Sequence, residues 1–140
     1  MYTLIFDEST FGNTERSLKM LRDVLVHRID RHIAVIEVPS DHLCCGFLVL
    51  DKDAKEAVFV GDGFRTDNRG EGGAGYKSAK ALLNLFGISS RCWGDAPNAW
   101  DAASHDEMPG ILVRLVDEIQ RSLKIDHYTK PCDRTPGYIR

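Results

Sequence analysis

Short apolar runs and longer stretches of helical periodicity alternate along this chain. Runs rich in β-branched and aromatic residues predict four strands, at residues 2–6, 31–38, 43–50 and 56–61. Apolar side chains spaced three or four apart predict three helices. Two are expected at residues 13–29 and 109–125, and the third has its amphipathic pattern at residues 76–86 and is expected to start among the glycines just before it. A further short strand is expected at residues 88–93, because Gly87 is a natural residue to end the helix before it.

The order of these elements, β-α-β-β-β-α-β-α, predicts a single α+β domain. We expect a mixed or largely antiparallel sheet of about five strands, with three helices packed on it. The domain is expected to span residues 1–125. Residues 126–140 are polar and contain prolines, so we expect a C-terminal tail, in which Tyr138 and Ile139 suggest docking on a neighbouring subunit.

Residues 61–75 hold six of the chain's 12 glycines, between a predicted strand and a predicted helix. We expect this segment to be a glycine-rich loop, an arrangement that presents backbone N–H groups and a helix N-terminus to an anion. Arginine and lysine side chains nearby add full positive charges, and an aromatic ring there is able to stack on a base. The expected ligand-binding residues are Phe64, Arg65, Arg69, Gly72, Gly73, Gly75, Tyr76, Lys77 and Ser78.

Acidic residues in the same segment favour a plainer interpretation. Asp62, Asp67 and Glu71 offset much of its positive charge, so the glycines are also consistent with a mobile connection between a hairpin and a helix. Long loops without secondary structure are uncommon in small domains unless they are functional or disordered. Both interpretations therefore remain open at the level of the sequence.

Three known phosphate-binding patterns were compared with this segment. Gly70 to Gly75 has the glycine spacing of the Walker phosphate loop, but Tyr76 is inserted before the lysine and turns it by roughly 100° about the helix. A dinucleotide fingerprint also fits these glycines, without the βαβ context that it requires. Residues 67–81 resemble the glycine-rich loop of macro domains, which precedes a helix and holds the phosphates of ADP-ribose. That resemblance covers this segment alone and implies a type of ligand.

Candidate catalytic groups are few. Asp62 is the best placed, because it lies between two glycines where a strand enters the predicted loop, and it is a candidate general base. With Asp7 or Glu8 it is also a candidate for holding a divalent cation such as Mg²⁺ if the protein is an enzyme. His42 and His105 are weaker candidates. The four cysteines show no metal-ligand spacing, so no protein-bound metal is expected.

Charge and composition exclude some classes of protein. A net charge of −3 makes a nucleic-acid-binding function unexpected, because such proteins usually carry a basic surface. The chain has neither a basic segment before its first apolar run nor a window of the ~18 apolar residues that span a membrane, so a cytoplasmic location is expected.

The leading hypothesis is a sensor or sequestering protein for a phosphate-bearing small molecule, with a nucleotide as the expected ligand. The alternatives are a metal-dependent phosphoesterase or nucleotide-processing enzyme, and a homo-oligomeric protein-interaction module without a ligand.

Overall fold

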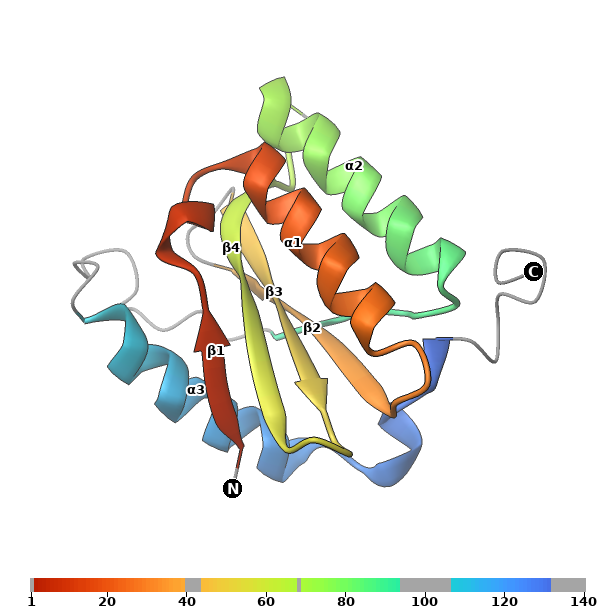
Figure 1. Ribbon diagram of the computed structural model, residues 1–140. Coiled ribbons are helices and arrows are strands. Elements are labelled where there is room, and N and C mark those ends of the chain that lie inside the picture. The colour runs from red at the N-terminus through yellow and green to blue at the C-terminus, as the bar shows by residue number, and fades with distance from the viewer. Residues whose placement is uncertain (1, 40–43, 68, 94–106, 132–140) are drawn as a thin grey trace.

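Five strands form a single sheet in the part of the chain that the computed structural model describes, residues 2–39, 44–67, 69–93 and 107–131 (Figure 1). The side chains of Cys44 and Asp62 are not part of this description. The strands are β1 (Thr3–Phe6), β2 (Ile33–Pro39), β3 (Cys44–Asp51), β4 (Glu56–Arg65) and β5 (Arg91–Cys92). The helices are α1 (Thr14–His27), α2 (Gly70–Leu85) and α3 (Met108–Ser122), with short 3₁₀ helices at η1 (Glu8–Thr10) and η2 (Ile125–His127).

The sheet is mixed, in the order β1-β4-β3-β2-β5. β2, β3 and β4 form an antiparallel meander, whereas β1 pairs with β4 and β5 pairs with β2 in the parallel sense. These pairings, together with three helices, confirm the predicted α+β class.

Helices cover both faces of the sheet, which explains why its central strands are apolar at nearly every position. α1 and α2 lie on one face and α3 lies on the other (Figure 1). Along β2, Val35 belongs to the same buried cluster as Leu21 of α1, and its neighbour Ile36 belongs to the cluster on the other face with Leu112 of α3. A strand that is buried on both sides lacks the alternation of apolar and polar residues found in half-exposed strands.

The prediction of a glycine-rich loop over residues 61–75 is wrong. β4 continues to Arg65 and α2 begins at Gly70, so only residues 66–69 connect them. The helix does start inside the glycine segment, as expected, but about five residues before the predicted first turn at Gly75: glycine has a low helix propensity, and tertiary contacts override that preference. Gly70 has φ of +62°, a conformation that glycine adopts without strain.

A bulge in β4 accounts for another part of the glycine-rich segment. Val60 pairs with Phe47 and Phe64 pairs with Cys45, so residues 61–63 of β4 lie opposite Gly46 alone. Such bulges bend a strand and increase its local twist. The bulge turns the end of β4 toward the beginning of α1.

Close backbone packing explains the glycines of the bulge and of α2. A Cβ atom on Gly63 would lie 2.6 Å from the carbonyl carbon of Asn13, and one on Gly75 would collide with the methyl group of Thr14. The Thr14 hydroxyl donates a hydrogen bond to the carbonyl oxygen of Gly63 at 2.6 Å. The start of α1 thus lies directly against both β4 and α2.

The remaining boundaries differ from the predicted ones by a few residues. α1 ends at His27 and α3 at Ser122, and β5 is limited to Arg91–Cys92. In the segment predicted to be a tail, Thr129 forms an antiparallel bridge with Ile33. Tyr138 and Ile139 lie outside the described residues. Among the described helices, none has the length and apolar character needed to cross a membrane.

We predict that Gly75→Ala lowers the free energy of unfolding by about 1–2 kcal/mol, although alanine is the better helix former. The reason is the collision with the Thr14 methyl group, because the hydrogen bond to Gly63 fixes that side chain. Thr14→Ser removes the methyl group but keeps the hydroxyl, so Thr14→Ser/Gly75→Ala should recover most of the loss. Urea denaturation of each variant measures these differences.

Gly110→Ala in α3 is the matched control, because a Cβ there has no heavy atom within 4 Å. It should raise the free energy of unfolding by about 0.5 kcal/mol. If Gly75→Ala were stabilising to the same degree, close packing against α1 would not be the reason for glycine at position 75.

Candidate functional site

The beginning of α2 presents backbone N–H groups. Arg69 is the N-cap residue, with extended backbone angles, and its side chain forms no capping hydrogen bond. The N–H of Gly73 donates to the carbonyl oxygen of Arg69 at 2.9 Å. The amides of Gly70, Glu71 and Gly72 therefore precede the first helical hydrogen bond, as at any helix N-terminus, and add to the positive end of the helix dipole.

Two arginines and one aspartate surround these amides. The Arg65 guanidinium donates two hydrogen bonds to the Asp67 carboxylate, at 3.0 and 2.7 Å, and the backbone N–H of Arg69 donates to the same carboxylate at 3.3 Å. The hydrogen bond from Arg65 lowers the pKa of Asp67 to about 2. Asp67 is thus ionised at neutral pH and neutralises Arg65, while the Arg69 residue is exposed.

Most of the other predicted binding residues are buried or half-buried, and only two of them are exposed. Phe64 is fully buried and its ring contacts that of Phe47 edge to face, with 5.3 Å between centroids. Tyr76 is half-buried and its ring stacks on the same phenylalanine at 6.4 Å. Gly72, Gly73 and Gly75 are buried, whereas Lys77 and Ser78 are exposed in the next turn. Arg65, Arg69 and Gly72 are the predicted residues that come together at the start of α2.

A second polar cluster lies under the middle of α2, around Glu37. This residue is the single acid of β2 and lies on the same face as Val35, beneath α2. Tyr76 and Lys80 are four residues apart and therefore share one face of that helix. The Tyr76 hydroxyl donates to Glu37 Oε1 at 2.6 Å, and Lys80 Nζ donates to Oε2 at 2.7 Å.

Ser90, just before β5, completes this group, which we call the Glu37 cluster (Glu37, Tyr76, Lys80, Ser90). Its hydroxyl donates to Glu37 Oε2 at 2.7 Å and accepts from Lys80 Nζ at 2.6 Å. The Glu37 side chain is only 10 % exposed, and that of Lys80 is 40 % exposed. Such a fully hydrogen-bonded charge pair is the form in which proteins bury a carboxylate.

The pKa values of the cluster follow from these contacts. Burial would raise the pKa of Glu37, but the hydrogen bonds from Lys80, Tyr76 and Ser90 outweigh it and hold that pKa below its ordinary value. Burial, together with the hydrogen bond to Glu37, raises the pKa of Tyr76. The carboxylate is therefore charged and the phenol is a proton donor at neutral pH.

The sequence prediction did not single out the Glu37 cluster. One signal was present, since a lone carboxylate within the apolar run of residues 31–38 requires a partner if the strand is central. The partners themselves come from α2 and from the segment before β5, at distances along the chain that no spacing rule covers.

A cavity of about 380 Å³ lies beside the Glu37 cluster, at the edge of β2 between β5 and the Thr129 bridge. Its polar lining includes Ser89, Ser90, Arg91, Asp126 and His127. Ser90 thus belongs both to the cluster and to the wall of the cavity.

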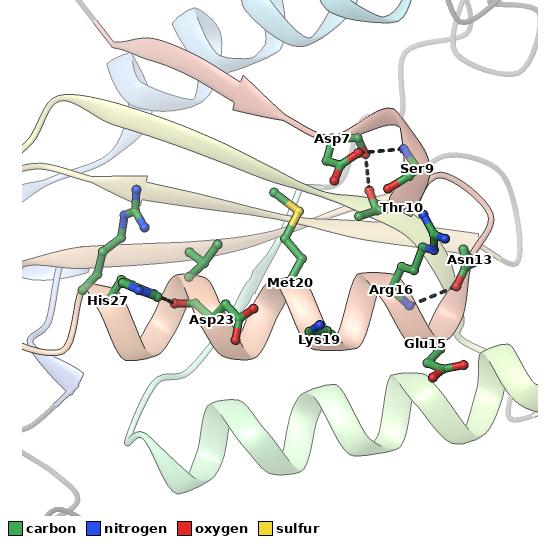
Figure 2. Close-up of a pocket in the computed structure, with 12 residues that line it drawn as sticks. Asp7, Ser9, Thr10, Asn13, Glu15, Arg16, Lys19, Met20, Asp23 and His27 are labelled. Atoms are coloured by element: carbon green, nitrogen blue, oxygen red, sulfur yellow. Dashed lines mark hydrogen bonds between the residues drawn. The ribbon is translucent and has the colours of Figure 1, made fainter.

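A larger groove of about 740 Å³ runs along α1 on the side of η1 (Figure 2). Its charged lining is balanced between three acids and three basic residues: Asp7, Glu15, Asp23, Arg16, Lys19 and Arg28. The Asp7 carboxylate accepts a hydrogen bond from the Ser9 amide at 2.9 Å (Figure 2). Hydrogen bonding with the Ser9 side chain, and then with this amide, lowers the pKa of Asp7. The groove has no preference for one sign of charge and contains none of the predicted binding residues.

The metal hypothesis involves residues that the structure describes only in part. Asp62 lies in the bulge of β4, where its backbone but not its side chain is described. His42 and His105 lie outside the described residues. Among the residues that are described, no three histidine, cysteine, aspartate or glutamate side chains form a group that could hold a metal ion.

Comparisons with protein-family models, with curated proteins and with solved structures find no match to this chain. Two arrangements of residues therefore indicate function, one at the beginning of α2 and the other around Glu37.

We predict that Glu37→Gln lowers the free energy of unfolding by about 2 kcal/mol at pH 7, because it leaves Lys80 without its charge partner. The folded pKa of Glu37 is depressed, so its contribution is present above its ordinary pKa of 4.5 and is lost as the pH falls through the folded value. The difference in the free energy of unfolding between wild type and variant should therefore be smaller at pH 3 than at pH 7, as measured by urea denaturation.

Glu118→Gln, at an exposed acid of α3, serves as the control and should change stability by less than about 0.5 kcal/mol at either pH. A difference for Glu37→Gln that stayed constant between the two pH values would contradict an ionised Glu37 in the folded protein.

Proposed function

We propose that the protein binds a small phosphate-bearing molecule at the beginning of α2, with nucleotides as the first class of ligand to test. It would act by binding, as a sensor or sequestering protein. The observation that carries this proposal is the N-terminus of α2, where the N-cap residue Arg69 forms no capping hydrogen bond with its own side chain and Arg65 lies close by.

The chemistry of the site suits a phosphate group. The first-turn amides and the positive end of the helix dipole favour an anion at this position, and each such interaction contributes about 0.3–1 kcal/mol at an exposed site. Arg69 is exposed at the N-cap and is able to donate two parallel hydrogen bonds to phosphate oxygens. A few backbone amides and one guanidinium favour a modest affinity for phosphate, which suits a sensor of an abundant metabolite.

The site is also held in place before any ligand arrives. The stem of Arg65 lies close to Gly72, where an added Cβ would be 2.7 Å from Arg65 Cγ. The head of Arg65 is directed by Asp67. A phosphate would compete with the Asp67 carboxylate for Arg65, so Arg69 and the first-turn amides would provide the principal contacts.

A metal-dependent phosphoesterase is the second candidate, and the bulge in β4 favours it. Bulges are common next to active sites, where they redirect a side chain, and this one contains Asp62. Release of inorganic phosphate from a bound nucleotide in the presence of Mg²⁺ would support turnover instead of simple binding.

We predict that one or more ligands in a panel of nucleotides, ADP-ribose and inorganic phosphate raise the melting temperature. At about 100 times its Kd a ligand adds about 2.7 kcal/mol, which corresponds to about 8 °C for a domain of this size. Arg69→Ala should abolish the shift, whereas Arg114→Ala, at an exposed arginine of α3, should preserve it. If no ligand moves the wild-type melting curve, the phosphate hypothesis fails.

A second variant separates ligand binding from helix stability. We predict that Arg69→Asp raises the free energy of unfolding by about 1 kcal/mol, because Asp is a favourable N-cap residue and Arg69 already has extended backbone angles. The same carboxylate would accept hydrogen bonds from the first-turn amides and repel a phosphate, so the shift in melting temperature with ligand should disappear. A variant that is more stable and still responds to the ligand would place the binding site elsewhere.

A further inference from the structure

Ser90 has the surroundings of an activated nucleophile. Nucleophilic catalysis requires a hydroxyl within hydrogen-bond reach of a base, and a third group that holds the base in position. Ser90 Oγ lies 2.7 Å from Glu37 Oε2, and the Tyr76 hydroxyl holds the other carboxylate oxygen at 2.6 Å. The three groups come from three different elements, β2, α2 and the segment before β5, and meet at one point.

Lys80 adds a positive charge at the oxygen that would react. Its Nζ atom lies 2.6 Å from Ser90 Oγ and 2.7 Å from Glu37 Oε2, so the three atoms form a closed triangle. An ammonium group at this distance stabilises negative charge that develops on the serine oxygen during attack. Lys80 also keeps Glu37 ionised, so that the carboxylate is able to accept the serine proton.

Ser90 is half-buried and helps to line the cavity of about 380 Å³. Cavities of this size accommodate small organic molecules. Arg91, which is exposed, lies on the same wall. A small acyl compound bound in the cavity would lie against Ser90 and beside Arg91, whose guanidinium suits a carbonyl or carboxylate oxygen.

We infer that Ser90 is a nucleophile for acyl transfer from a small carboxylic ester, with Glu37 as its base and Lys80 as the stabilising charge. This activity is separate from ligand binding at the start of α2.

The reaction has two balanced steps. Ser90 Oγ attacks the ester carbonyl carbon, its proton passes to Glu37, and the new C–O bond forms as the alcohol leaves with that proton. Water then attacks the acyl-serine, gives one proton to Glu37, and releases the carboxylic acid as the proton returns to Ser90 Oγ. No oxidant or metal is needed for either step.

The test uses the full chain and two chemical probes. A fluorophosphonate forms a stable bond to an activated serine oxygen and releases fluoride, while p-nitrophenyl acetate reports acyl transfer through release of p-nitrophenol. We expect the fluorophosphonate to add one group to the wild-type chain, and peptide mapping to place it on Ser90. Because mapping is done on the wild type, this result does not depend on the folding of a variant.

Variants assign the roles. Ser90→Ala should abolish labelling, and Ser122→Ala, at an exposed serine of α3, should leave it unchanged. Glu37→Gln should slow labelling by about 100-fold, the lower range of a general base contribution. Lys80→Met should slow it as well and alter the pH profile of the labelling rate, which a purely structural lysine would not do.

Two outcomes overturn the inference: a wild-type chain that remains unlabelled under conditions that label a serine hydrolase, or a label that maps to Ser89, to another serine or to a lysine. Circular dichroism of each variant confirms that a loss of labelling is not a loss of fold.

Discussion

The contact between the start of α1 and the second half of β4 sets the positions of most other elements in the described part of the chain. The Thr14 hydroxyl binds the Gly63 carbonyl oxygen, and the Gly61 amide donates to the Thr10 hydroxyl at 3.2 Å. These backbones approach so closely that a single added carbon atom would overlap a neighbour. α2 packs on the same threonine through Gly75, so a single rigid arrangement contains the bulge, α1 and α2. Close-packed interiors of this kind have low compressibility and transmit strain.

The Glu37 cluster fixes the middle of α2 on the sheet. A carboxylate under a helix is costly to bury alone, and it is tolerated here because ammonium, phenol and serine hydroxyl groups all donate to it. The same contacts join α2 to β2 and to the segment before β5. α2 is thus fixed near its beginning by close packing on α1 and at its middle by charge, which leaves its first-turn amides in a defined position relative to Arg65.

Much of the fold was predictable from the sequence, and the candidate sites were predictable only in part. The periodicity of residues 13–29 and 109–125 located α1 and α3 to within a few residues, because a helix with one buried face repeats its apolar positions regularly. The glycine-rich segment was misread, because the same glycines that suit a flexible loop also suit a bulge and a closely packed helix. Glu37 was overlooked, since the residues that make it significant lie 39 to 53 positions away in the chain.

The sequence by itself determined the α+β class, the hairpin that β3 and β4 form, and the concentration of arginines and glycines around the start of α2. These features depend on local patterns of apolar and turn-forming residues, which act over a few positions. The tertiary structure decided that the glycines of α2 lie inside a helix, that Arg65 is neutralised by Asp67, and that Glu37, Tyr76, Lys80 and Ser90 meet. Those outcomes depend on close packing between backbones and on the pairing of buried charges. Both kinds of contact form between elements that are distant in the chain.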